Sequence, residues 1–158
     1  MSQGALYKHF GSKQELIAAS AEHLFSRLIE EFRTALSVGT DGEDRVSRAM
    51  RLLWDIFLTP ELYAVLELYC AARTDDALRG ALAPVLFRHR ENLLVEARQL
   101  FPEAAAQNPR FDIVVDGLLT AMQGAALSAA VLPELASAPE ATLYFEQLCR
   151  RELEGPFQ

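Results

Sequence analysis

The chain has 158 residues, which is enough for one domain or for a domain with a short appendage. Apolar residues make up 51% of it, so a sizeable core can be buried and general disorder is disfavoured. The net charge of -7 argues against a generally basic nucleic-acid binder, and two cysteines are too few for a disulfide scaffold. We find no uninterrupted run of eighteen apolar residues and no signal peptide, and therefore expect a cytoplasmic protein without a membrane span.

The first part of the chain is predicted to contain three helices. A very short one covers Ser2–Phe10. The next runs from Ser12 to about Leu36, because Ser12 and Glu15 have the spacing of a capping box and apolar residues then recur every three or four positions. A third helix is predicted from Glu43 to Leu58.

Four more helices are predicted in the rest of the chain. Thr59 and Pro60 have the residue types of an N-cap and a first helical position, and that helix reaches Arg73. Asp75 or Asp76 then caps a long helix to Leu100, in which Pro84 predicts a kink. The last two are the most apolar helix, Arg110–Leu132, and a helix that Ser137 and Glu140 cap and that ends near Glu154. No segment alternates with a period of two, so the sequence predicts an all-α protein of seven helices.

Charge is unevenly distributed along this chain. Residues 1–14 contain Lys8 and Lys13 and no acidic residue, so the whole acidic excess lies after them. This N-terminal tip is the stretch where DNA phosphate would be accommodated most easily. Two lysines in so short a segment can also be chance, and charge alone does not decide between the two interpretations.

A motif in the same segment does favour DNA. Ser2–Leu16 (SQGALYKHFGSKQEL) resembles the signature of the TetR family of transcriptional regulators, where the recognition helix of a helix-turn-helix leads into the helix that joins it to the ligand-binding domain. The resemblance is dense over about the first eighteen residues and extends to the rest only as an all-helical architecture. It implies that residues 1–11 are a remnant of the DNA-binding domain and residues 12–158 a ligand-binding and dimerisation domain, with 12–36 as the connecting helix.

The sequence departs from the family pattern at its beginning. The family's DNA-binding unit has three helices, and Met1 falls where the third begins. A single short recognition helix is not stable by itself, since helix nucleation costs more than so few hydrogen bonds return. We therefore expect the chain as given to bind operator DNA weakly or not at all. A longer native product, a start set at an internal methionine and a true loss of the first helices all fit this expectation.

The resemblance implies a set of DNA contacts. The N-terminal residues of a recognition helix face base edges in the major groove, and glutamine can make a bidentate contact to adenine. Backbone contacts come from the residues that follow, with a lysine in the first turn of the next helix near a phosphate. Each of these residues could instead be an ordinary surface or core residue. The set is Ser2, Gln3, Gly4, Tyr7, Lys8, His9 and Lys13.

The resemblance also implies a small-molecule site within the helical domain. Candidates are aromatic, sulfur-containing or polar residues on otherwise apolar faces, although most such residues simply belong to a core. Arg73 needs a partner on such a face, which could be Glu67, Asp75, Asp76 or an anionic ligand. The candidates are Met50, Trp54, Phe57, Leu66, Tyr69, Arg73, Leu86, His89, Leu93 and Met122. Binding of a small, largely apolar effector is expected to shift the protein between two arrangements and so release a palindromic operator.

A homodimer is expected because a two-fold operator needs a two-fold reader. Small residues recur every four positions between Arg110 and Leu132, which lets another helix approach closely, and by resemblance this helix and the last one pair with their symmetry mates. Packing of this stripe within one chain is the alternative. The expected interface is Val114, Gly117, Leu118, Ala121, Ala125, Ser128, Ala129, Leu143, Tyr144 and Leu148.

Nothing in the sequence has the spacing of a catalytic or metal site. His9, His23 and His89 are isolated, and neither a zinc motif, a nucleophile elbow nor a glycine-rich phosphate loop is found. We therefore expect no enzyme activity, no cofactor and no metal. By family analogy, the expected regulator is a repressor. The remaining alternative is an interaction protein, a truncated ligand-binding and dimerisation module that modulates a full-length relative.

Overall fold

The computed structural model describes residues 10–38, 44–136 and 139–154, and this part of the chain is all-α, as predicted. Only Phe10 of the predicted first helix and none of its other residues belongs to the described part. The helices are α2 (Lys13–Ser37), α3 (Arg45–Phe57), α4 (Pro60–Ala72), α5 (Asp76–Leu100), α6 (Pro102–Gln107), α7 (Phe111–Ala129), α8 (Pro133–Ala136) and α9 (Pro139–Glu154).

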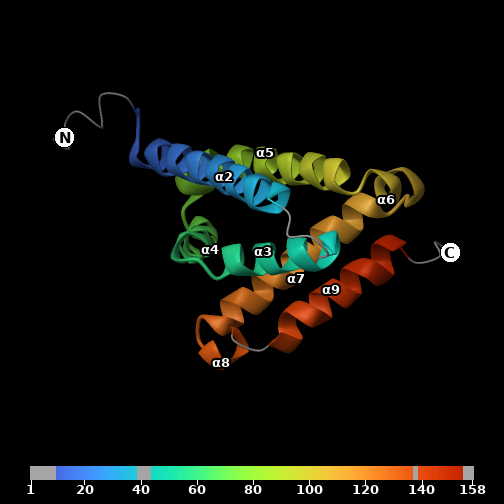
Figure 1. Ribbon diagram of the computed structural model, residues 1–158. Helices are drawn as coiled ribbons and strands as arrows, with labels where there is room; N and C mark the ends of the chain where they lie inside the picture. Colours follow the sequence, from blue (N-terminus) through green and yellow to red (C-terminus); the bar gives the residue numbers. More distant parts are fainter. Residues whose placement is uncertain (1–9, 39–43, 137–138, 155–158) are drawn as a thin grey trace.

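The two longest helices, α2 and α5, lie side by side and run in the same direction (Figure 1). Ion pairs join them at two levels, Glu22 with Arg88 and Arg33 with Glu96. Beneath them, α3 contacts α2, α4, α7 and α9, and α7 and α9 form an antiparallel pair. The central position of α3 connects the upper helix pair to the lower one.

Local capping chemistry sets the helix starts, as the sequence predicts. The Ser12 hydroxyl accepts a hydrogen bond from the Glu15 amide at 3.1 Å, and the Glu15 carboxylate reaches back to the Gly11 amide at 2.8 Å. Thr59 caps α4 with Pro60 in its first turn, and Asp75, rather than Asp76, caps α5. Each of these side chains satisfies a backbone N–H that the helix itself cannot pair.

Two short helices, α6 and α8, are absent from the sequence-based prediction of seven helices. Helices of six and four residues contain too few positions to display a hydrophobic period. The predicted kink site, Pro84, lies within a helix that continues without interruption from Asp76 to Leu100. Proline removes the bond to the Gly80 carbonyl, and both residues are exposed, so water can hydrate that carbonyl.

The core consists of two apolar clusters. One joins α3, α7 and α9 and includes Met50, Trp54 and Met122. The other joins α4 to the first halves of α2 and α5 and includes Phe25 and Leu82. Because α2 contributes to both clusters, it spans the boundary between them.

Among the described residues, helix α7 is long and apolar enough to cross a membrane by length and composition. Polar residues interrupt it, so the sequence still contains no unbroken run of eighteen apolar residues. About 28% of its apolar 18-residue stretch is buried within the described structure. Its buried side, which includes Phe111, Leu118 and Met122, is part of the core. Val114, Leu119 and Ala125 are half-buried and also pack against the core, whereas Ile113 and Leu127 are exposed.

Candidate functional site

An apolar cavity of about 120 Å³ lies where the two core clusters meet. Helices α2, α3, α4, α5, α7 and α9 all contribute to its wall. Its lining is almost entirely aliphatic or aromatic, with three exceptions, His89, Glu96 and Cys149. Cavities of this chemistry hold small apolar molecules more readily than water. The lining residues are Phe25, Leu28, Ile29, Phe32, Ala49, Met50, Leu53, Ile56, Phe57, Leu62, His89, Leu93, Glu96, Ala97, Leu100, Phe101, Val115, Leu118, Leu119, Cys149 and Leu153.

Helix α2 forms one wall with Phe25, Leu28, Ile29 and Phe32. Positions three, four and seven apart lie on one face of a helix, so these four side chains point the same way. The sequence-based candidates include none of them. The repeated phenylalanines on this face were the available signal, but periodicity cannot separate a cavity wall from an ordinary core face.

Helix α5 forms the facing wall with His89, Leu93, Glu96 and Leu100. The His89 ring stacks on Phe25 with a centroid distance of 3.8 Å and an interplanar angle of 7°, which connects the two walls. Burial lowers the pKa of His89 to about 4, so its imidazole is neutral at pH 7. Its Nδ1 atom is buried and makes no hydrogen bond.

Glu96 is the charged residue of the lining, and its partner comes from α2. Arg33 donates from Nε to Oε2 of Glu96 at 3.2 Å and from Nη2 to Oε1. A second carboxylate, Glu30, accepts from Nη1 of the same guanidinium at 2.6 Å. The hydrogen bond to Glu96 is the largest cause that raises the pKa of Arg33. A charge at the cavity wall is thus tied directly to α2.

The structure places four of the ten sequence-predicted ligand residues at this cavity: Met50, Phe57, His89 and Leu93. Trp54 and Met122 are buried in the core instead, where Trp54 packs near Phe145 at a centroid distance of 5.8 Å. Leu66, Tyr69, Leu86 and Arg73 are likewise not part of the lining. Arg73 follows the end of α4 and is exposed, so water can hydrate its guanidinium and no partner is required.

The predicted DNA contacts fall mostly outside the described residues. Of the seven, only Lys13 is described; it is exposed in the first turn of α2. Ser2, Gln3, Gly4, Tyr7, Lys8 and His9 are not described. The position of Lys13 leaves its ammonium accessible to a phosphate near the start of the helix.

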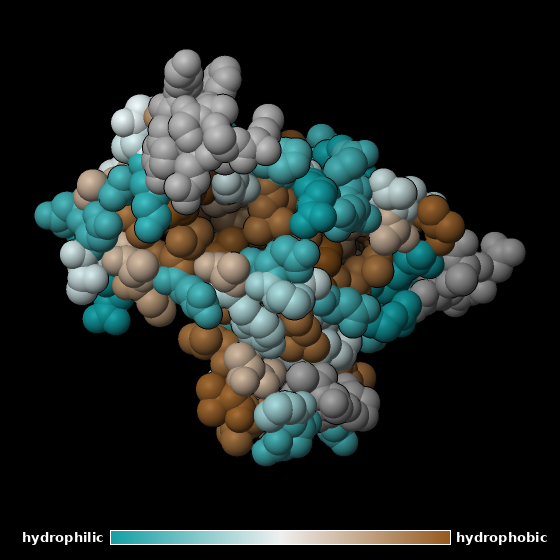
Figure 2. Space-filling view, turned by 90° about the vertical axis from the view of Figure 1, so that its left-hand side faces the viewer, coloured by the Kyte–Doolittle hydropathy of each residue, from teal (hydrophilic) through white to brown (hydrophobic). Residues whose placement is uncertain are grey.

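The predicted dimer residues divide according to burial. Gly117, Ala121, Ser128, Leu143 and Tyr144 are exposed. Leu118 and Ala129 belong to the core of the protomer and have almost no surface for a partner, and Leu118 also lines the cavity. Val114, Ala125 and Leu148 are half-buried. The lowest part of Figure 2, where α8 and the adjoining ends of α7 and α9 lie, carries an apolar patch beside hydrophilic residues.

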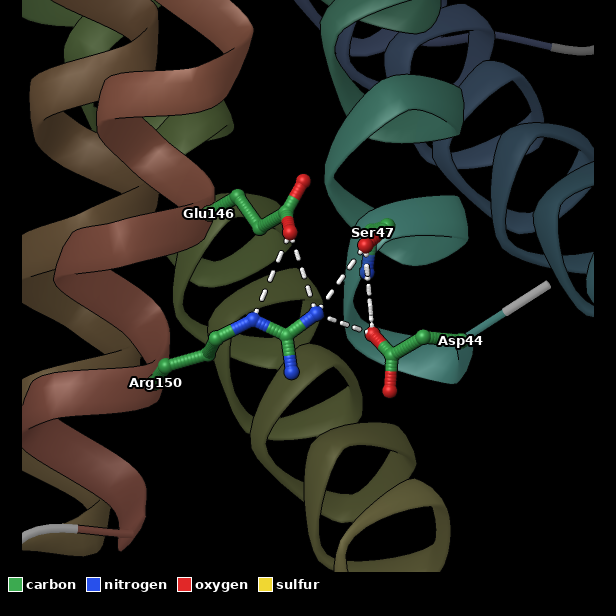
Figure 3. A network of polar contacts seen from close by, with 4 residues as sticks. All are labelled: Asp44, Ser47, Glu146 and Arg150. Carbon is green, nitrogen blue, oxygen red and sulfur yellow. Dashed lines mark hydrogen bonds and ion pairs between the residues drawn. The ribbon is translucent and has the colours of Figure 1, made fainter.

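A polar network fixes α9 to the beginning of α3 (Figure 3). Arg150 donates to Asp44, to the Ser47 hydroxyl at 3.0 Å and to Glu146 at 3.0 Å. Asp44 is also the N-cap of α3, accepting from the Ser47 amide at 3.0 Å. The hydrogen bond from Arg150 is the largest cause that lowers the pKa of Asp44 to about 2. This network positions helices, and none of its four residues lines the cavity.

Within the described ranges, no group of three or more His, Cys, Asp or Glu side chains is arranged to hold a metal ion. Cys70 is exposed and Cys149 is buried, and they do not form a disulfide with each other. The described lining of the cavity is thus apolar apart from His89, Glu96 and Cys149.

Comparisons with known proteins place the chain among relatives of helix-turn-helix regulators. It is 28% identical over 134 residues to an uncharacterized HTH-type transcriptional regulator of Mycobacterium tuberculosis, which covers 85% of this chain and 69% of the relative. It is 29% identical over 109 residues to the HTH-type transcriptional regulator BetI of Rhizobium meliloti, covering 68% of this chain and 54% of BetI. It is 30% identical over 90 residues to the HTH-type transcriptional regulator CymR of Pseudomonas putida, and this alignment covers 57% of this chain and 44% of CymR. No family model matches the chain, and no solved structure matches it significantly.

Proposed function

We propose that this chain provides the effector-binding and dimerisation part of a DNA-binding transcriptional regulator of the TetR family. The regulator acts as a cytoplasmic repressor, and a small, largely apolar molecule releases it from a palindromic operator. The similarity to HTH-type transcriptional regulators and the signature-like segment Ser2–Leu16 support this assignment.

The observation that carries the proposal is the double role of α2. This helix begins at Lys13, directly after the segment that resembles a recognition helix. Its residues Phe25, Leu28, Ile29 and Phe32 line the cavity. A molecule that enters the cavity therefore contacts the same rigid helix that follows the DNA-reading segment.

The mechanism follows from that connection. A ligand shifts the position of α2 only if it binds one arrangement of the helices more tightly than the other. The cavity lies where the two core clusters meet, so a molecule in it contacts side chains of both clusters. In a dimer, such a displacement changes the separation of two recognition helices and lowers operator affinity.

The proposed dimer uses the exposed side of α7 together with α9. Gly117 and Gly124 have open space where a Cβ atom would lie, and Ala121 between them is exposed. These small residues make a flat strip on which a second copy of α7 can pack closely. Leu143 and Tyr144 of α9 add exposed apolar area. Leu118 and Ala129 are omitted from this interface because they are buried in the protomer.

The test uses protein purified from its native source to select binding sites from random duplex DNA. The intact mass of that protein is compared with the 17.6 kDa of this chain. We expect enrichment of a palindromic site, bound by a dimer and released by small apolar compounds. A protein that dimerises and binds such compounds but selects no DNA would contradict the proposal and favour the modulator of a related regulator.

Lys13 gives a sharper test once an operator is known. Lys13→Ala should weaken binding to operator and to unrelated DNA about equally and should reduce the salt dependence by roughly one counterion. Lys8 is the other lysine of the motif and also a predicted DNA contact, so Lys8→Ala should reduce the salt dependence in the same way. An unchanged salt slope would exclude a phosphate contact by Lys13.

A further inference from the structure

The cavity has one charged side chain among its described lining residues, and that side chain is acidic. Glu96 lies on α5 among aliphatic and aromatic neighbours, and its side chain is only 14% exposed. A carboxylate in such surroundings requires a cation, because burying an unpaired charge is strongly unfavourable. In this structure, that cation is Arg33.

The two partners depend on the ion pair to different degrees. The Arg33 side chain is 49% exposed and also pairs with Glu30 at 2.6 Å. Its guanidinium would remain hydrated and paired after leaving Glu96. Within the part of the chain that the structure describes, Glu96 pairs with no second cation, so it would need a replacement. A cation that enters from the cavity side can therefore displace Arg33 at little cost to Arg33.

The rest of the lining suits the same kind of molecule. Four phenylalanines, Phe25, Phe32, Phe57 and Phe101, line the cavity with Glu96. The faces of aromatic rings attract organic cations, and the attraction increases where water is excluded. An anionic ligand would instead meet Glu96 and a lining that offers no positive charge.

We propose that the ligand of this cavity is an organic cation, an apolar body with one ammonium group, which binds Glu96 in place of Arg33. This inference rests on the proposed effector role of the cavity. Exchange of the ion pair would remove the link between the last third of α2 and α5. The links made by Glu22 with Arg88, and by Arg27 with Glu61 of α4, would persist nearer the start of α2. Occupancy of the cavity is thereby transmitted to α2.

The test compares benzylamine, benzyl alcohol and benzoate, which share an aromatic body and differ in charge, by isothermal titration calorimetry with the full chain at pH 7. We expect benzylamine to bind about tenfold or more tightly than benzyl alcohol, and benzoate to bind weakest. Equal or tighter binding of benzyl alcohol or benzoate would overturn the cation assignment while leaving a ligand-binding cavity. Failure of all three to bind would contradict both the inference and the effector role of the cavity.

Variants of the ion pair separate the two partners. Glu96→Gln should lower benzylamine affinity about tenfold and leave benzyl alcohol affinity within about twofold. Arg33→Gln removes the competitor and should raise benzylamine affinity several-fold. Arg88→Gln breaks the ion pair with Glu22, outside the cavity, and is the matched control with unchanged affinities. An Arg33→Gln protein that melts like the wild type yet binds benzylamine no better would refute displacement of Arg33.

Discussion

His89 is a buried imidazole whose environment favours the uncharged form. It stacks on Phe25, lines the cavity and leaves its Nδ1 atom without a hydrogen bond. An unpaired buried polar atom makes a net unfavourable contribution to folding, whereas the ring contact is favourable. The side chain therefore contributes shape and area to the cavity wall more than polarity.

His89 makes stability depend on pH. Burial lowers its pKa from the ordinary 6.5 to about 4, so between these values the unfolded chain takes up a proton that the folded protein does not. The free energy of unfolding should thus be highest above pH 6.5 and fall by up to roughly 3 kcal/mol as the pH falls to 4. His89→Phe retains a ring against Phe25 and should remove this part of the pH dependence. Urea unfolding at a series of pH values measures it.

The control for this experiment is the exposed His23 on α2. His23→Gln also removes one histidine from the chain but alters no cavity residue. If His23→Gln flattened the pH profile as much as His89→Phe does, burial of His89 would not be the cause.

At the scale of single elements, one side chain at the beginning of α3, Asp44, has two structural roles. Asp44 caps the helix through the Ser47 amide and also binds Arg150 of α9. Asp44→Ala should lower the free energy of unfolding by about 1–2 kcal/mol at pH 7, because the cap is lost. Asp44→Asn retains a capping oxygen and should cost less. Thermal or urea unfolding of both variants separates the cap from the charge.

The charge of Asp44 should appear in the pH dependence of the same pair. Arg150 and Ser47 lower the pKa of Asp44 from 3.8 to about 2, so its charge stabilises the fold above pH 3.8 and this contribution is lost as the pH falls towards 2. The advantage of the wild type over Asp44→Asn should shrink across that range. A constant difference would show that the ion pair with Arg150 contributes nothing measurable.

Capped helix starts are features that the sequence predicts well, because caps are local, whereas the most apolar helix, predicted over Arg110–Leu132, spans Phe111–Ala129. Ser12, Thr59 and Asp75 each accept from the amide three residues further on, and the structure has each of them at the predicted helix start. The helices α6 and α8 are too short for a period. The cavity was only partly predictable: His89 and Leu93 were candidates, but the wall formed by α2 depends on which face of that helix meets α5, and this is a tertiary property.

At the scale of the whole molecule, one helix serves two surfaces. The buried side of α7 contributes Val115 and Leu118 to the cavity wall. Its opposite side presents Ile113, Gly117, Gly124 and other exposed residues to solvent. If α7 pairs with a second copy, the interface and the cavity are separated by the thickness of a single helix. A ligand that shifts α7 would then act on the dimer as well as on α2.

The exposed strip of α7 gives a test of the dimer that leaves the protomer intact. A Cβ atom at Gly124 would meet nothing within 4 Å, and glutamate is a better helix former than glycine by a few tenths of a kcal/mol or more. Gly124→Glu should therefore fold at least as stably as a protomer. Two copies of this charge would face each other across the two-fold axis, so we expect the variant to be monomeric at micromolar concentrations where the wild type is dimeric. Light scattering coupled to size-exclusion chromatography measures the mass of each.

Ala64→Glu on the exposed side of α4 is the matched control and should remain dimeric. A dimeric Gly124→Glu protein would place the interface elsewhere, and a monomeric wild type would rule out the proposed two-fold reader.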